Sequence, residues 1–357
     1  MPTNVQNKPA ANALAQPKKL DIGRLLLGIG RLLLEGRAFF ALIAIIIFFS
    51  FMSPYYFTIN NFLIMSSHVA IFGLLALGML LVILNGGIDL SVGSTLGLCG
   101  VFAGYLMQGV NIELLGITFY PSLWVVVVLT CALGAAVGCV NGVLIAHFKV
   151  PAFVATLGTM YVARGIALLI TNGLTFNKLD GKEELGNTGF EWLGFNRLAG
   201  IPISVIVLII VALICGLVLS RTAFGRWLYA SGGNESAANL SGVPVIRVKV
   251  IVYIISGICA ALAGLVLASQ LTSAGPTAGT TYELTAIAAV VIGGAALTGG
   301  RGTVRGTILG ALVIGYLSDG LVIIGVSAYW QTVFTGTVIV LAVLLNSLQY
   351  SSKGNGR

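Results

Sequence analysis

The sequence predicts an all-α membrane protein that crosses the bilayer about ten times. Of its 357 residues, 57% are apolar and only 8% are charged, whereas a soluble domain carries about 25% charged residues. Apolar runs recur along the chain, and runs of about 20 residues are long enough to cross a hydrocarbon core of about 30 Å. Because lipid offers no hydrogen-bond partners to a bare backbone, the runs must be helices or a closed barrel. They lack the alternating pattern of a barrel, so we expect helices.

Residues 1–37 form the first predicted segment, a cytoplasmic tail. They are too long and too polar for a signal peptide. Their last stretch, RLLLGIGRLLLEGR (24–37), interleaves leucines with Arg24, Arg31 and Glu35. This pattern is typical of an amphipathic helix that lies on the lipid of an anionic inner leaflet. We expect this helix to anchor the tail to the membrane.

Ten apolar segments follow the tail and make up a membrane domain over residues 38–348. They are predicted at 38–54, 62–84, 91–108, 122–146, 151–171, 201–219, 248–269, 284–298, 306–325 and 329–348. The eighth segment is short, and it is the candidate for one arm of a re-entrant pair. Residues 349–357 form a second cytoplasmic tail, so both termini lie on the same side.

The placement of the basic residues orients the chain. With the N-terminus inside, 15 of the 19 Lys and Arg fall in cytoplasmic segments, three fall in outer loops, and Arg164 lies within a span. The positive-inside rule therefore supports this orientation. The net charge of +8 is then an orientation signal and not a nucleic-acid footprint. The large outer loop, 172–200, is acidic and aromatic, which suits a soluble partner, the membrane interface or an ordinary solvated surface.

The residue types needed for enzyme chemistry are missing from the sequence. The chain has no G-x-x-x-x-G-K-[ST] motif to cradle nucleotide phosphates. His68 and His147 lie far apart, and no cluster of carboxylates flanks them. The five cysteines all fall in apolar runs without metal-ligand spacing, so we expect reduced core residues. The sequence predicts neither an enzyme nor a cofactor or metal bound to this chain.

The long cytoplasmic loop, 220–247, is predicted to contain one short helix. Asn234 is a good N-cap, Glu235 in the first turn favours the helix dipole, and Gly242 marks the end. About two turns are too few for a helix to be stable alone, so packing must stabilise it.

This predicted helix presents little bulk to its surroundings. Its small or apolar side chains are Ala237, Ala238 and Leu240. Such a smooth helix could enter a groove on another protein, or it could simply cap the inner face of the bundle.

The segment ILNGGIDLSVGSTLG (83–97) interrupts the apolar pattern between the second and third spans. An unpaired carboxylate in mid-membrane costs at least about 2.5 to 3.5 kcal/mol, so Asp89 needs a partner or water. One interpretation makes Asp89 the N-cap of the third span, where it would accept hydrogen bonds from Ser91 or Val92. Glu283 and Asp319 raise the same question, and Arg164 either pairs with one of them or snorkels outward.

Two further patterns concern small residues. GGIDLSVGSTLG (86–97) and GGRGTVRGTILG (299–310) match at five of twelve positions, four of them glycine. Such repeats around glycine-broken hydrophobic segments occur in transporter folds. Small residues in the fourth and seventh spans, including Gly134, Gly138 and Gly257, lie at spacings that allow close helix packing.

Three blocks of the chain resemble the membrane permease subunits of bacterial ABC importers for simple sugars. They are GGIDLSVGS (86–94), GRWLYASGGNESAANLSGV (225–243) and SAGPTAGTTYELTAIAAVVIGGAALTGGRGT (273–303). The resemblance extends from about residue 40 to residue 348 and is closest to the ribose, xylose, arabinose and galactose permeases. It implies an ABC importer permease fold in the bacterial inner membrane and a monosaccharide as cargo.

The same resemblance implies partners. These are a second permease copy, a periplasmic sugar-binding protein, and a cytosolic ATPase subunit that holds ATP and Mg while this chain binds no cofactor. The resemblance also implies that the helix from Asn234 to Gly242 couples this chain to the ATPase.

A pathway role is the second interpretation of the polar break. Asn85, Asp89, Ser91 and Ser94 would line a route along which sugar hydroxyls make weak, shared hydrogen bonds. Two other classes stay open at this point. One is an ion-coupled secondary sugar transporter in which Asp89, Glu283 or Asp319 carries a proton, and the other is a passive sugar facilitator.

Overall fold

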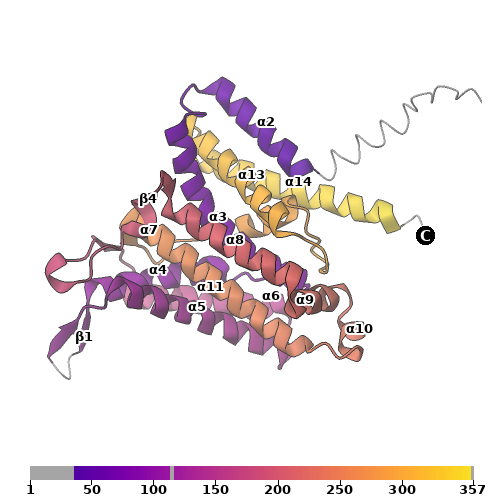
Figure 1. Cartoon of the computed structure of the whole chain (residues 1–357), viewed down its shortest axis with the longest axis horizontal. Helices are drawn as coiled ribbons and strands as arrows, with labels where there is room; N and C mark the ends of the chain where they lie inside the picture. Colours follow the sequence, from indigo (N-terminus) through magenta and orange to yellow (C-terminus); the bar gives the residue numbers. More distant parts are fainter. Residues whose placement is uncertain (1–35, 113–115, 355–357) are drawn as a thin grey trace, which may run out of the picture. The chain divides into compact units, whose positions relative to one another are not determined.

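The computed structural model describes residues 36–112 and 116–354, and most of the described chain is helical (Figure 1). The chain divides into residues 1–37 and residues 38–357, and the second unit holds nearly all of the described residues. The predicted amphipathic helix at 24–37 lies almost entirely outside the described residues.

Each of the ten predicted apolar segments contains one helix. These helices are α2 (Arg37–Met52), α3 (Ile59–Leu84), α4 (Val92–Gln108), α5 (Leu123–Ala146), α6 (Ala152–Thr171), α8 (Ile203–Arg221), α11 (Val245–Leu271), α12 (Tyr282–Ile292), α13 (Val304–Ile323) and α14 (Ala328–Gly354). Within the part of the chain that the structure describes, α3, α5, α6, α8, α11 and α13 are each long and apolar enough to cross a bilayer. The protein is therefore a mostly helical, polytopic membrane protein.

The predicted helix at 284–298 is wrong in its second half. The helix α12 ends at Ile292, and the chain then turns through Gly293 and Gly294, where φ is +95° at Gly294. Eleven residues reach only about 16 Å, roughly half of a hydrocarbon core. By itself α12 cannot cross the membrane.

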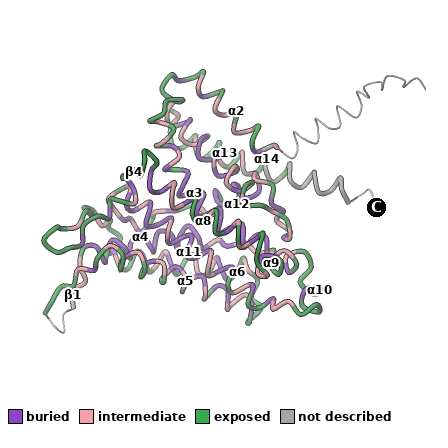
Figure 2. The backbone as a smooth tube through the Cα atoms, viewed as in Figure 1, coloured by how far each residue is buried: buried purple, intermediate pink, exposed green. Residues whose placement is uncertain are grey.

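Helix α3 forms the centre of the core. Almost all of its inner two-thirds is buried, and α8, α11, α12 and α13 pack against it. The helices α5, α6 and α8 instead have few buried residues, and the rest are half-buried or exposed (Figure 2). Such surfaces suit contact with lipid or with another membrane subunit.

Small residues bring α5 and α11 into close contact, as the sequence predicts. A Cβ atom added to Gly138 would lie 2.1 Å from the carbonyl oxygen of Tyr253. Gly134 and Gly257 are equally close to one another. The two helices therefore approach backbone to backbone, which holds the middle of α11 in a fixed position against α5.

Short strand pairs, which the sequence did not predict, order the loops. They are β1 (Val110–Ile112) with β2 (Ile117–Phe119), β3 (Phe176–Asn177) with β6 (Ser273–Ala274), and β4 (Arg197–Leu198) with β5 (Ile201–Pro202), all antiparallel. The loop 172–200 also contains the 3₁₀ helix η2 (Glu183–Leu185) and the helix α7 (Trp192–Phe195), which packs on the end of α11. The five cysteines are free thiols, as expected.

Candidate functional site

The break between α3 and α4 is the first component of the candidate site. Helix α3 ends at Leu84 with Asn85 as its C-cap, and Gly86 follows with φ +80°. Helix α4 starts at Val92. Residues 85–91 lie between the two helices in an otherwise apolar region, so the polar groups that the helix ends leave unbonded need partners elsewhere in the protein.

Asp89 is the buried carboxylate of this break. Its side chain is 2% exposed, and Oδ1 accepts hydrogen bonds from the Ser91 backbone N–H (3.0 Å) and the Ser91 hydroxyl (2.6 Å). Oδ2 accepts from the Ser256 hydroxyl of α11 at 2.9 Å. Asn141 of α5 donates to the Ser91 hydroxyl oxygen at 2.9 Å. These four side chains, the Asp89 cluster, tie the start of α4 to α5 and α11.

One detail of the prediction for Asp89 is wrong. The N-cap of α4 is Ser91, which lies two residues later, because the chain makes one further turn before the helix begins. The predicted hydrogen bond from the Ser91 N–H is confirmed. Asp89, Ser91 and Ser94 are all buried, with exposures of 2 to 3%.

A close contact between glycine backbones is the second component of the site. The helix α9 (Ala223–Gly233), which the sequence patterns did not predict, packs its last turn against the end of α3. A Cβ atom on Gly232 would lie only 1.7 Å from the carbonyl oxygen of Leu84. That carbonyl also accepts a hydrogen bond from the Gly300 N–H at 2.9 Å. We call these three residues the glycine junction.

Two more contacts extend the junction into the break. The Ser231 hydroxyl donates to Oδ1 of Asn85 at 3.1 Å. A Cβ atom on Gly299, where φ is +90°, would lie 3.0 Å from the Gly86 nitrogen. The two segments that echo each other in the sequence therefore touch at their first glycine.

The short helix predicted in the long loop is confirmed as α10 (Glu235–Leu240). The side chain of Asn234 accepts a hydrogen bond from the Ala237 N–H at 3.0 Å, and Gly242 follows the helix with φ +82°. Ala238 is buried, whereas Leu240 is 90% exposed. Helix α10 begins directly after α9, whose last turn contains Gly232 of the glycine junction.

A polar pocket of about 710 Å³ lies between the break and α10. Its polar lining residues are Asn85, Lys149, Glu235, Ser236, Asn239 and Lys249. The ammonium of Lys249 lies 2.7 Å from Glu235 Oε1, which binds α11 to α10. Of the four residues predicted for the pathway, Asn85 lines this pocket, and Glu235 of the predicted coupling helix lines it as well.

The remaining charges in the apolar region have partners. Arg164 of α6 donates to the carbonyl oxygens of Pro276 and of Ala278, the latter at 2.8 Å, and it attracts Glu283 electrostatically. Nδ1 of His68 lies 3.2 Å from Asp319 Oδ1. Arg164 therefore does not snorkel outward but holds the chain ahead of α12.

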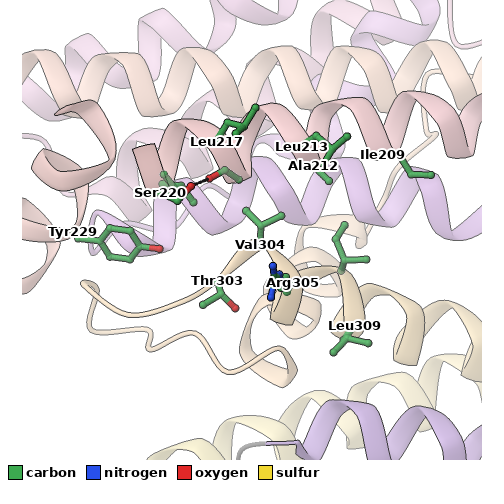
Figure 3. A pocket seen from close by; sticks show the side chains of 13 residues that line it. Ile209, Ala212, Leu213, Leu217, Ser220, Tyr229, Thr303, Val304, Arg305 and Leu309 are labelled. Atoms are coloured by element: carbon green, nitrogen blue, oxygen red, sulfur yellow. Dashed lines mark hydrogen bonds between the residues drawn. The ribbon is translucent and has the colours of Figure 1, made fainter. Parts of the chain in front are cut away.

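A second pocket lies between α8 and α13, with Tyr229 of α9 at one end (Figure 3). Its lining is mainly aliphatic, from residues such as Ile209, Leu213 and Leu309, with Arg305 among them. The Tyr229 hydroxyl donates to the Gly302 carbonyl oxygen at 2.9 Å. An aliphatic lining suits lipid chains better than a hydrated solute, so this pocket is not part of the candidate site.

Comparison with known proteins gives consistent matches over most of the chain. A family model described as the permease component of the branched-chain amino acid transport system matches residues 61–343. The ribose import permease protein of Escherichia coli is 44% identical over 315 residues, covering 88% of this chain and 94% of the relative. That of Bacillus subtilis is 45% identical over 310 residues, covering 86% and 91%.

A more distant match is the galactose/methyl galactoside import permease protein of Haemophilus influenzae. It is 34% identical over 330 residues, covering 90% of this chain and 96% of the relative. No solved structure matches the chain.

The Asp89 cluster allows a test of what the carboxylate does. In Asp89→Asn one oxygen can still accept from Ser91, and the amide can donate to the Ser256 hydroxyl. We expect its stability to stay within about 1 kcal/mol of the parent chain. Asp89→Leu leaves buried donors unpaired, at a cost of about 1–3 kcal/mol for each. Thermal unfolding in detergent should rank the variants in this order, and equal destabilisation of both would show that the charge itself is required.

Gly232 and Gly233 form a matched pair for the glycine junction. A methyl group on Gly232 overlaps the Leu84 carbonyl, whereas nothing lies within 4 Å of the corresponding position on Gly233. We expect Gly232→Ala to destabilise the fold by about 1–3 kcal/mol and Gly233→Ala to leave the unfolding temperature unchanged. Equal behaviour of the two variants would contradict the tight contact between α9 and α3.

Proposed function

The chain belongs to the family of membrane permease subunits of bacterial ABC importers for simple sugars, and we propose that it forms the path by which a monosaccharide enters the cell. Two observations support this proposal. The relatives that match nearly the whole chain are sugar import permeases. The glycine junction also connects the exposed helix α10 to a break in the membrane-embedded part of the chain.

The proposed substrate is a pentose of the ribose type, with a hexose such as galactose as the next candidate. The ranking follows the identities, because the ribose import permeases share 44% and 45% with this chain and the galactose permease shares 34%. In such an importer the soluble binding protein makes most of the selection, so the membrane path needs to accept a neutral, polyhydroxylated solute rather than recognise one isomer.

The proposed topology has ten membrane elements with both termini in the cytoplasm. Residues 1–37 and 349–357 are the two tails, and 38–348 is the permease domain. The eighth element crosses the membrane as a combination of two parts, the non-helical segment 275–281 and the helix α12 that follows it. The basic residues near α9 and α10, among them Arg226 and Arg247, then face the cytoplasm. The loop 172–200, with its short strands and α7, then faces the periplasm, where a binding protein docks.

Coupling to ATP is proposed to act through α10. A cytosolic ATPase subunit holds ATP and Mg, and two copies of this chain share the central path. The 90% exposed Leu240 enters a groove on the ATPase. Closure of the ATPase moves α10 and α9, and the glycine junction passes this displacement to Leu84 and the break. The path then opens to alternate sides of the membrane.

The energy source is the first point to test. Vesicles that hold this chain with its ATPase and binding protein should accumulate labelled ribose in the presence of a protonophore. Ribose uptake should stop when vanadate is added. Loss of uptake with the protonophore alone would identify an ion-coupled secondary transporter. Equilibration that is insensitive to both reagents would identify a passive facilitator.

Leu240 tests the coupling step. Leu240→Asp places a charge on the contact that we assign to the ATPase groove, while the exposed site keeps the fold intact. We expect uptake to fall by at least about tenfold, which corresponds to about 1.4 kcal/mol of lost contact, with ATP hydrolysis retained. Leu240→Met keeps the apolar bulk and should transport normally. Unchanged coupling in Leu240→Asp would assign α10 a purely structural role.

A further inference from the structure

A non-helical segment enters the apolar region beside α4. It packs against three glycines of α4, and each contact lies within 3 Å of the position that a Cβ atom on that glycine would take. The contacting atoms are the Ala274 side chain at Gly104, the Ala278 carbonyl oxygen at Gly97 and the Gly279 carbonyl oxygen at Gly93. From Gly104 to Gly93 the helix rises by about 16 Å. The segment 275–281 therefore runs about half the thickness of the hydrocarbon core without forming a helix.

Helix α12 begins where this segment ends, near the middle of the membrane. The ring of Tyr282 packs on Phe72 with ring centroids 4.9 Å apart, and Phe72 lies at the centre of the membrane-spanning helix α3. The first turns of α12 and α4 are adjacent, because a Cβ atom on Gly93 would lie 2.4 Å from Glu283 Oε2. Two helix N-termini therefore meet at mid-membrane, and Glu283 lies in the first turn of one of them.

One side of the segment 275–281 is held by hydrogen bonds to Arg164, and the threonines on its other side are exposed. Arg164 binds the carbonyl oxygens of Pro276 and Ala278. The side chains of Thr277, Thr280 and Thr281 are exposed. The Thr280 hydroxyl donates to the Thr277 carbonyl at 2.7 Å, and within the described residues no side-chain hydrogen bond involves the hydroxyl of Thr277 or Thr281.

Hydrocarbon does not tolerate this arrangement. Irregular backbone at membrane depth occurs only where protein buries it or where it lines a water-filled cavity. The exposed face of 275–281 therefore does not face lipid. The Asp89 cluster is different, because its four side chains are buried and linked to one another by hydrogen bonds.

We propose that Thr277, Thr280 and Thr281 line the aqueous translocation path at mid-membrane and exchange hydrogen bonds with the hydroxyl groups of the cargo. This inference rests on the proposed function for the nature of the cargo. Neutral hydroxyls both donate and accept, so they match a polyhydroxylated solute without holding it tightly. The nearby charges of Arg164 and Glu283 attract each other, which leaves the exposed surface neutral.

Cysteine labelling tests the water-filled face directly. Thr277→Cys and Thr280→Cys in the assembled complex in vesicles should react with a charged, membrane-impermeant methanethiosulfonate reagent. Val128→Cys on α5 is the control, because Val128 is 65% exposed on an apolar helix and should not react. The parent chain sets the background from its five native thiols. Equal labelling of all three variants, or labelling of Val128→Cys alone, would overturn the proposal.

A second measurement connects the face to the cargo. Thr277→Val combined with Thr280→Val keeps side-chain shape but removes two hydroxyls, and we expect ribose uptake to fall by about three- to tenfold with normal assembly. Ribose should also slow labelling of Thr277→Cys. Unchanged uptake and unchanged labelling rates would overturn the cargo contact. Failure of the proposed function is distinguishable, because the complex with the parent chain would then show no ATP-driven uptake at all.

Discussion

The central constraint on this protein is that every interruption of a helix inside the bilayer must find hydrogen-bond partners within the protein. The described chain satisfies this constraint in three ways. The break at 85–91 is closed by the Asp89 cluster. The turn after α12 is closed by backbone hydrogen bonds, such as that from the Ala296 N–H to the Arg301 carbonyl at 2.9 Å. The segment 275–281 is closed on one side only, by Arg164, and this asymmetry is what distinguishes it from the other two.

The same interruptions connect distant parts of the fold. The Leu84 carbonyl ends α3, accepts from Gly300 and touches Gly232 of α9, so three separate chain segments share one point. Gly232 and Gly300 have no side chains, so their backbones pack directly against their neighbours, with no side chain between Gly232 and the Leu84 carbonyl. In the function that we propose, a movement at α10 reaches the end of α3 through α9 as a backbone shift, and α3 is the helix around which the core is built.

Local rules predicted much of the fold and part of the site. Apolar length located all ten helices, and the capping signals of Asn234 and Gly242 located α10 and its first residue. The close packing of Gly138 followed from helix spacing alone. Helix α9 was missed because its glycines, Gly232 and Gly233, resemble a turn, and they are needed for a tertiary contact that no local pattern reveals. The depth of Thr277 was also out of reach, because a threonine in an irregular segment looks like any solvated loop until the neighbouring helix is known.

The distribution of charge bears on how such a path is driven. Asp89 accepts hydrogen bonds from hydroxyl donors, Glu283 lies in the first turn of α12 and is attracted by Arg164, and Asp319 lies 3.2 Å from Nδ1 of His68. None of these three carboxylates is part of the exposed surface formed by Thr277, Thr280 and Thr281, which carries hydroxyl groups. A path lined by neutral groups can pass a neutral solute in either direction with similar ease, so it contains no source of directionality. In the function that we propose, directionality therefore enters where the chain is exposed and connected to the break, at α10 and the glycine junction.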